Sequence, residues 1–127
     1  MDGKSGTQEV EVVHPVVLFH IPHSFRYGMP SEELYHATRQ FWKMGSRREK
    51  AEFAFAVFDG IVQEVYRIVD WYQAGTTFST RSSEGYEKRW EFVGRVAEPE
   101  IRDRYLLKSV RRNFKKGDQS PFRYINA

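Results

Sequence analysis

The chain has 127 residues, of which 40% are hydrophobic and 16% aromatic, enough to form one domain with one core and too apolar for a disordered chain. It has no cysteine, which excludes disulfide scaffolds, thiol chemistry and thiolate-held metal clusters. Residues 1–100 hold 12 basic and 15 acidic side chains, a net charge of −3, whereas residues 101–127 hold 8 basic and 2 acidic ones, a net charge of +6. This asymmetry suits a polyanion such as nucleic acid, and a solvated helix face is the alternative interpretation.

Residues 1–8 are polar and glycine-rich, so we expect a flexible tail before a single α+β domain over residues 9–127. No apolar run is long enough to span a bilayer, and the first residues lack a secretory apolar core. We therefore expect a cytoplasmic protein without a membrane partner. Val10–Val13 and Val16–Ile21 are rich in β-branched residues and predict extended segments, and a loop follows over His23–Pro30.

A helix is predicted to begin after Ser31, whose hydroxyl would cap free backbone N–H groups, with Glu32 and Glu33 in its first turn. Apolar and small residues then recur at helical spacing as far as Gly45, which predicts the end of the helix there. A charged connector or helical turn is expected over Ser46–Glu52.

The clearest pattern in the chain is a predicted β-hairpin. Phe53–Phe58 alternates large and small side chains, as in a strand with one tightly packed face. Asp59-Gly60 suits a type I′ turn, and Ile61–Val69 is predicted as the returning strand.

The last third of the chain predicts a long mobile loop over Gly75–Lys88 and a strand over Arg89–Val96. A helix is then expected to start at Pro99 and to continue to Phe114, because its apolar residues keep helical spacing. Phe122–Ile125 predicts a closing strand. This order predicts an α+β fold, a small curved sheet or open β-barrel with two main helices.

Enzymatic chemistry has little support in the sequence. His14, His20 and His23 lack the spacing of a metal site, so no metal and no other cofactor is expected. A metal-dependent nuclease would use carboxylates such as Asp59, Glu64 and Glu91. No phosphate-binding glycine loop and no nucleophile elbow is present, and we predict no catalytic residue.

Aromatic and basic residues carry the functional prediction. Trp71 and Tyr72 are predicted to end a strand beside the long loop, where a nucleic-acid base would stack, although core packing is the commoner role of such rings. Arg47 and Arg48 are expected to make secondary contacts. A ridge on the second helix is expected to contact phosphates, with solubility as its alternative role; it comprises Lys108, Arg111, Arg112, Lys115 and Lys116.

Two long segments carry a family resemblance. The first, residues 31–75, includes Arg47-Arg48-Glu49-Lys50-Ala51 and Phe55-Ala56-Val57-Phe58-Asp59-Gly60-Ile61; the second, residues 90–126, includes Ile101-Arg102-Asp103-Arg104-Tyr105 and Pro121-Phe122-Arg123-Tyr124. Together they resemble a group of short uncharacterised bacterial proteins, which implies no particular activity. The layout also resembles PUA-like barrels, including ASCH and EVE domains, which implies binding of RNA or of a modified base.

We therefore predict a nucleic-acid-binding module, for RNA or DNA and for a modified or flipped base, that is non-catalytic by itself. A metal-dependent nuclease is one alternative. A homo-oligomeric structural or interaction protein, whose aromatic side chains form an interface, is the other.

Overall fold

The computed structural model describes residues 7–77, 82–114 and 120–127. Its elements are β1 (Val16–His20), α1 (Ser31–Arg39), η1 (Ser46–Lys50), β2 (Phe53–Phe58), β3 (Ile61–Gln73), β4 (Trp90–Val96), α2 (Pro99–Tyr105), η2 (Arg111–Asn113) and β5 (Phe122–Ile125), where η marks a short 3₁₀ helix. All five strands predicted over residues 16–125 are present, and β3 runs four residues beyond its predicted end at Val69.

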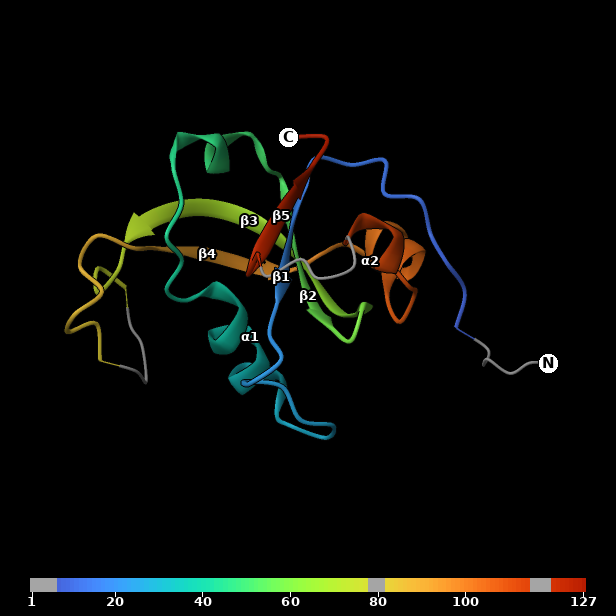
Figure 1. The fold of residues 1–127 in the computed structure, drawn as a ribbon, viewed down its shortest axis with the longest axis horizontal. Coiled ribbons are helices and arrows are strands. Elements are labelled where there is room, and N and C mark those ends of the chain that lie inside the picture. Colours follow the sequence, from blue (N-terminus) through green and yellow to red (C-terminus); the bar gives the residue numbers. More distant parts are fainter. Residues whose placement is uncertain (1–6, 78–81, 115–119) are drawn as a thin grey trace.

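The five strands form one mixed sheet in the order β4-β3-β2-β1-β5 (Figure 1). β1 and β2 are parallel, and the other neighbouring strands are antiparallel. The sheet curves but does not close, since β4 and β5 are its two edges (Figure 1). The predicted α+β fold with a small curved sheet and two helices is confirmed, and a closed barrel is absent from the described strands.

The predicted hairpin is formed by β2 and β3. Asp59 and Gly60 connect them with φ angles of 53° and 75°, the left-handed values that a type I′ turn requires at both central residues. A Cβ on Gly60 would lie 2.1 Å from Cγ of Arg111, so the arginine side chain packs directly over this turn.

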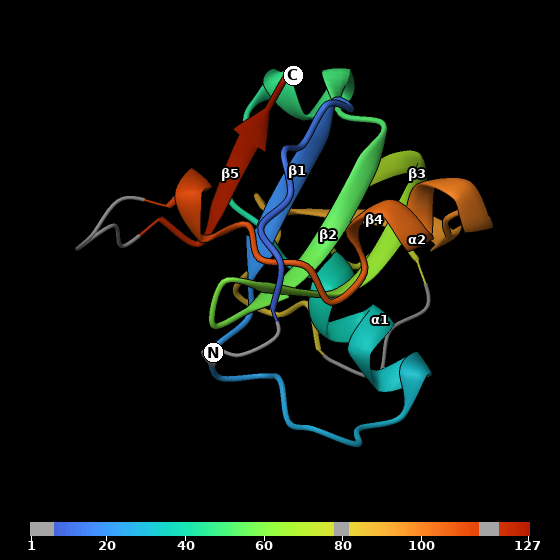
Figure 2. The same cartoon turned by 90° about the vertical axis from the view of Figure 1, so that its right-hand side faces the viewer.

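The sheet has a hydrophobic cluster on each face, and the alternation of β2 explains why. Phe53, Phe55 and Val57 point into one cluster, which also holds Tyr105 of α2 and is called here the α2-side cluster. Ala54 and Ala56 point the other way, into a cluster with α1, the α1-side cluster. Small residues on that side of β2 leave room for large aromatic rings. The two helices cover opposite faces of the sheet, and both contact strands among β2, β3 and β4, with β5 at the far edge (Figure 2).

The first helix differs from its prediction at both ends. Pro30 is its N-cap and the hydroxyl of Ser31 makes no capping hydrogen bond. The helix ends at Arg39, well before Gly45, and Gln40 is extended. The reason is tertiary: the backbones of Trp42 and Trp90 exchange two hydrogen bonds of 2.8 Å, so the chain leaves the helix to pair with the start of β4.

The second helix ends at Tyr105, so the predicted helix as far as Phe114 is wrong. Leu107 has a φ of 61°, a left-handed value that ends a helix. The chain then runs back along the β2–β3 hairpin, where Leu107 donates to the carbonyl of Val62 and Val110 donates to that of Gly60. Among the described residues after α2, the one further helical segment is the short η2. The basic residues of this region therefore do not form a ridge on one helix.

The N-terminal segment is only partly as predicted. Residues 1–6, most of the expected tail, lie outside the described residues. The extended segment predicted over Val10–Val13 forms no strand, although Val10 donates to the carbonyl of Ser109. In the described part of the chain, no helix is both long and apolar enough to cross a membrane.

Candidate nucleic-acid interface

The sequence-predicted site residues lie at two ends of β2. Arg47 and Arg48 belong to η1, which precedes β2, whereas Arg111 contacts the turn that follows β2. Lys108 and Arg112 flank this second group, and Lys115 and Lys116 lie outside the described residues. The structure thus does not bring the predicted residues together in one surface.

Arg47 and Arg48 are engaged with the fold. The guanidinium of Arg47 lies 4.7 Å from the ring centroid of Tyr124, and its Nε donates to the carbonyl of Ala127 at 2.9 Å. The guanidinium of Arg48 lies 3.3 Å from the ring centroid of Trp90, and its Nη1 donates to the carbonyl of Gly45. These contacts attach η1 to β5 and β4.

Trp71 and Tyr72 differ in exposure. Trp71 is 7% exposed, and its ring lies 5.5 Å from that of Phe92 and 6.5 Å from that of Phe19. It is therefore a core side chain of the α1-side cluster. Tyr72, the next residue on β3, is 36% exposed.

The three carboxylates considered for a nuclease are each paired with a different arginine. Asp59 pairs with Arg111, Glu64 with Arg102 and Glu91 with Arg39, and the three pairs are centred on different elements. No group of three or more His, Asp or Glu side chains suited to a metal ion occurs among the described residues.

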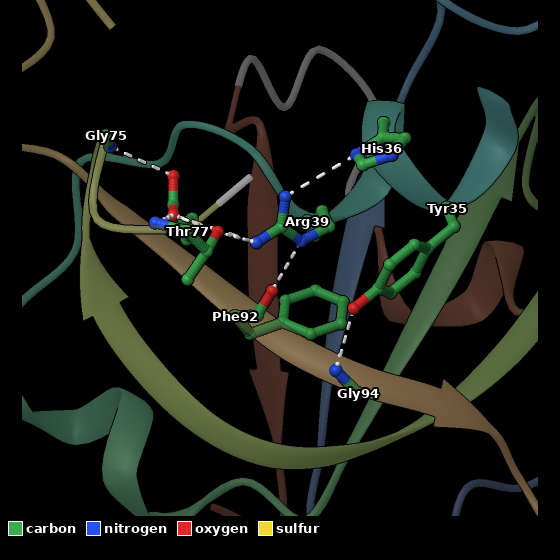
Figure 3. Close-up of polar contacts among 8 residues, drawn as sticks. Tyr35, His36, Arg39, Gly75, Thr77, Phe92 and Gly94 are labelled. Carbon is green, nitrogen blue, oxygen red and sulfur yellow. Dashed lines mark hydrogen bonds and ion pairs between the residues drawn. The ribbon is translucent and has the colours of Figure 1, made fainter. Parts of the chain in front are cut away.

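A buried polar network fixes the start of the loop after β3 (Figure 3). Arg39 and Glu91 are 2% and 0% exposed, with 3.7 Å between Nη2 and Oε2. Arg39 Nε donates to the carbonyl of Phe92 at 2.7 Å. The amides of Gly75 and Thr77 donate to Glu91 at 3.1 and 2.9 Å, and the Thr77 hydroxyl bonds both charged groups. Burial and the neighbouring Arg39 lower the pKa of His36, which lies beside this network.

A depression of about 250 Å³ lies between the end of β1, the segment after α1 and the residue before β4. Among the described residues that line it, those with titratable side chains are His20, His23, Lys43 and Arg89, and none of them carries a carboxylate. Trp42 contributes an aromatic wall. Its ring is held by stacking on Phe19, 4.5 Å between centroids, and by donation from Nε1 to the carbonyl of Thr38.

A second depression of about 350 Å³ shares Lys43 and Arg89 with the first and adds Lys88. Glu87 lines it too, and hydrogen bonds from backbone amides, that of Gly85 first, lower the pKa of this carboxyl. We call these two depressions, which share Lys43 and Arg89, the cationic trough. Its basic residues are His20, His23, Lys43, Lys88 and Arg89.

The backbone pairing of Trp42 with Trp90 creates the centre of the trough. In an antiparallel pair, the residue after one partner faces the residue before the other, so Lys43 lies opposite Arg89. Both side chains line both depressions, so two cationic groups stand where the depressions share residues.

The basic segment after α2 continues from the trough. His20 lines the trough, and its ring lies 5.8 Å from that of Phe114, the residue after η2. Arg111 and Arg112 of η2 are exposed, and Arg111 Nη2 pairs with Oδ2 of Asp59 at 3.3 Å. The first depression and the segment of η2 therefore adjoin each other at the end of β1 that carries His20.

Comparison with known proteins found no family model, no curated protein and no solved structure that matches this chain.

Lys43 and Arg89 are not among the site residues predicted from the sequence, in which Arg89 is expected as the start of a strand. A local signal was present, since Trp42-Lys43 and Arg89-Trp90 each place a cation next to a tryptophan. What the sequence does not contain is the pairing of these two dipeptides, which are 46 positions apart and are joined only by the tertiary fold.

Proposed function

We propose that this protein binds nucleic acid, with phosphate groups held in the cationic trough. The observation that carries the proposal is the apposition of Lys43 and Arg89 in a depression whose described lining has no carboxylate. Each phosphate contact to a basic side chain releases counterions, which favours binding at low salt. The resemblance to PUA-like barrels, which implies RNA binding, supports this proposal.

Trp42 gives the trough a second property of a nucleic-acid site. A base stacks on an aromatic ring without regard to its identity, and Trp42 lines the same depression as the four basic groups. Arg111 and Arg112 would extend the contact with phosphates beyond the trough. The net charge of +6 over residues 101–127 supports the approach of a polyanion to the molecule.

The test is a titration with single- and double-stranded oligonucleotides of DNA and RNA at several salt concentrations, followed by tryptophan fluorescence. Binding should weaken with salt and quench fluorescence, since Trp42 lines the trough. The double variant Lys43→Ala/Arg89→Ala should reduce the slope of log K against log[salt] by about 1.4 to 2.

Lys50→Ala/Arg104→Ala is the matched control, because it removes the same charge from two exposed positions outside the trough. It should leave most of the affinity intact. The absence of binding to every oligonucleotide at low salt contradicts the proposal. Equal losses in the two double variants would mean that net charge, and not the trough, holds the ligand.

A further inference from the structure

Tyr27 is the most exposed large apolar side chain in the described part of the chain, at 78%. Its ring is nevertheless held in place by two others. The centroid of Phe25 lies 5.1 Å away with the rings at 84°, and that of Phe58 lies 5.9 Å away with the rings at 88°. Edge-to-face contacts of this kind are favourable geometries for aromatic pairs. The ring is thus both positioned and accessible.

The backbone places Tyr27 at the corner of a tight turn. The amide of Met29 donates to the carbonyl of Arg26 at 3.2 Å, and Gly28, the residue after Tyr27, has a φ of 83°. A positive φ at that position is the mark of a type II turn, which requires glycine there. The turn therefore sets the direction of the Tyr27 side chain.

The same loop lines the cationic trough. Pro22, His23 and Ser24 belong to the first depression, and Tyr27 follows Ser24 by three residues. Three residues span at most about 11 Å even when fully extended, so the ring lies within reach of a few nucleotides held in the trough. Tyr27 also contacts Phe58, whose neighbour Asp59 pairs with Arg111, so the hairpin turn that carries this arginine lies next to the ring.

We propose that Tyr27 is a stacking platform for an unpaired base, and that the preferred ligand is therefore a single strand whose phosphates follow the cationic trough; this rests on the proposed function. A fixed, exposed ring beside a basic groove is the arrangement that binds single strands through stacking and phosphate contacts together. In a duplex the base faces are already stacked on one another, so the ring would gain nothing from it.

The experiment compares binding of three probes: a thymidine 12-mer, the same backbone without bases, and a duplex of equal length. Tyr27→Ala should weaken binding of the 12-mer about tenfold, in line with the loss of one stacked base, and should leave the baseless backbone unaffected. Tyr27→Phe retains the ring and should bind like the unchanged protein. Circular dichroism checks that each variant is folded.

Tyr72→Ala is the matched control, because it removes a partly exposed tyrosine from β3 and lines neither depression of the trough. If Tyr27→Ala binds the 12-mer as tightly as Tyr72→Ala does, the stacking platform is refuted while nucleic-acid binding stands. If the unchanged protein binds none of the probes, the proposed function itself fails. If Tyr27→Ala instead alters concentration-dependent light scattering with binding unchanged, the ring belongs to a protein interface and the proposal is overturned.

Discussion

The contacts of Glu98 predict how the stability of the fold depends on pH. Arg67 Nε donates to its Oε1 at 2.9 Å, and this hydrogen bond, with one from the backbone amide of Glu98, lowers the pKa of the carboxyl from 4.5 to about 2. A depressed pKa in the folded state stabilises the fold above the unfolded pKa. This stabilisation should be lost as the pH falls from 4.5 towards 2.

Carboxyl resonances followed by NMR between pH 6 and pH 1.5 should show Glu98 titrating near pH 2. Unfolding curves should show the unchanged protein more stable than Glu98→Gln above pH 4.5 and equal to it near pH 2. Glu100→Gln, in the first turn of α2, is the control and removes a carboxylate without breaking the ion pair with Arg67. A Glu98 resonance that titrates near pH 4.5 contradicts this prediction.

Glu91 holds the first residues of the loop between β3 and β4 in place. Its carboxylate accepts hydrogen bonds from the amides of Gly75 and Thr77 and faces Arg39, so Glu91→Gln leaves a buried guanidinium without this counterion. Breaking one partner of a buried pair costs about 3–5 kcal/mol. We expect a loss of this size in the free energy of unfolding, with faster hydrogen exchange at both amides.

The control for that experiment is Glu84→Gln, an exposed position in the same loop. It should change neither stability nor exchange at Gly75 and Thr77. Equal exchange rates in Glu91→Gln and Glu84→Gln would show that the loop is held by other contacts.

Elements were predictable where local and tertiary preferences agree. The β2–β3 hairpin follows from alternation and from Asp59-Gly60, and both signals are local. The region after Tyr105 has helical spacing of apolar residues, yet Leu107 and Val110 bond the β2–β3 hairpin instead. A repeating pattern of apolar residues indicates which side chains are buried, not which backbone conformation buries them. A non-helical segment that packs along a hairpin can show the same spacing of apolar residues as a helix.

The candidate site was less predictable than the fold for a related reason. Trp71 has the sequence context of a stacking residue, at the end of a strand before a loop. The register shift of β3 between Ile68 and Asp70 instead turns it to the face of Tyr66, so it packs in the α1-side cluster. Tyr27 stands in a segment with no regular pattern, and its exposure depends on the turn at Gly28 and on contacts with Phe58. Exposure of a single ring is a tertiary property, and composition does not encode it.

The whole molecule is organised around a sheet whose strand β2 supplies side chains to both clusters. All three tryptophans belong to one side: Trp71 lies in the α1-side cluster, and Trp42 and Trp90 pack against it. Tryptophan fluorescence therefore reports on one face only, while far-UV circular dichroism reports on the entire backbone.

This asymmetry makes the cooperativity of the two faces measurable. Phe55 is fully buried in the α2-side cluster, and Phe55→Leu should lower the free energy of unfolding by about 1–2 kcal/mol. Because β2 belongs to both clusters, we expect the two faces to unfold in one transition. The urea midpoint measured by tryptophan fluorescence should then fall by the same amount as the midpoint measured by circular dichroism. If the fluorescence midpoint stays unchanged while the dichroism midpoint falls, the α1-side cluster keeps its structure when the opposite face is weakened. The cationic trough, which adjoins that cluster through Trp42, would then unfold independently of the α2-side cluster.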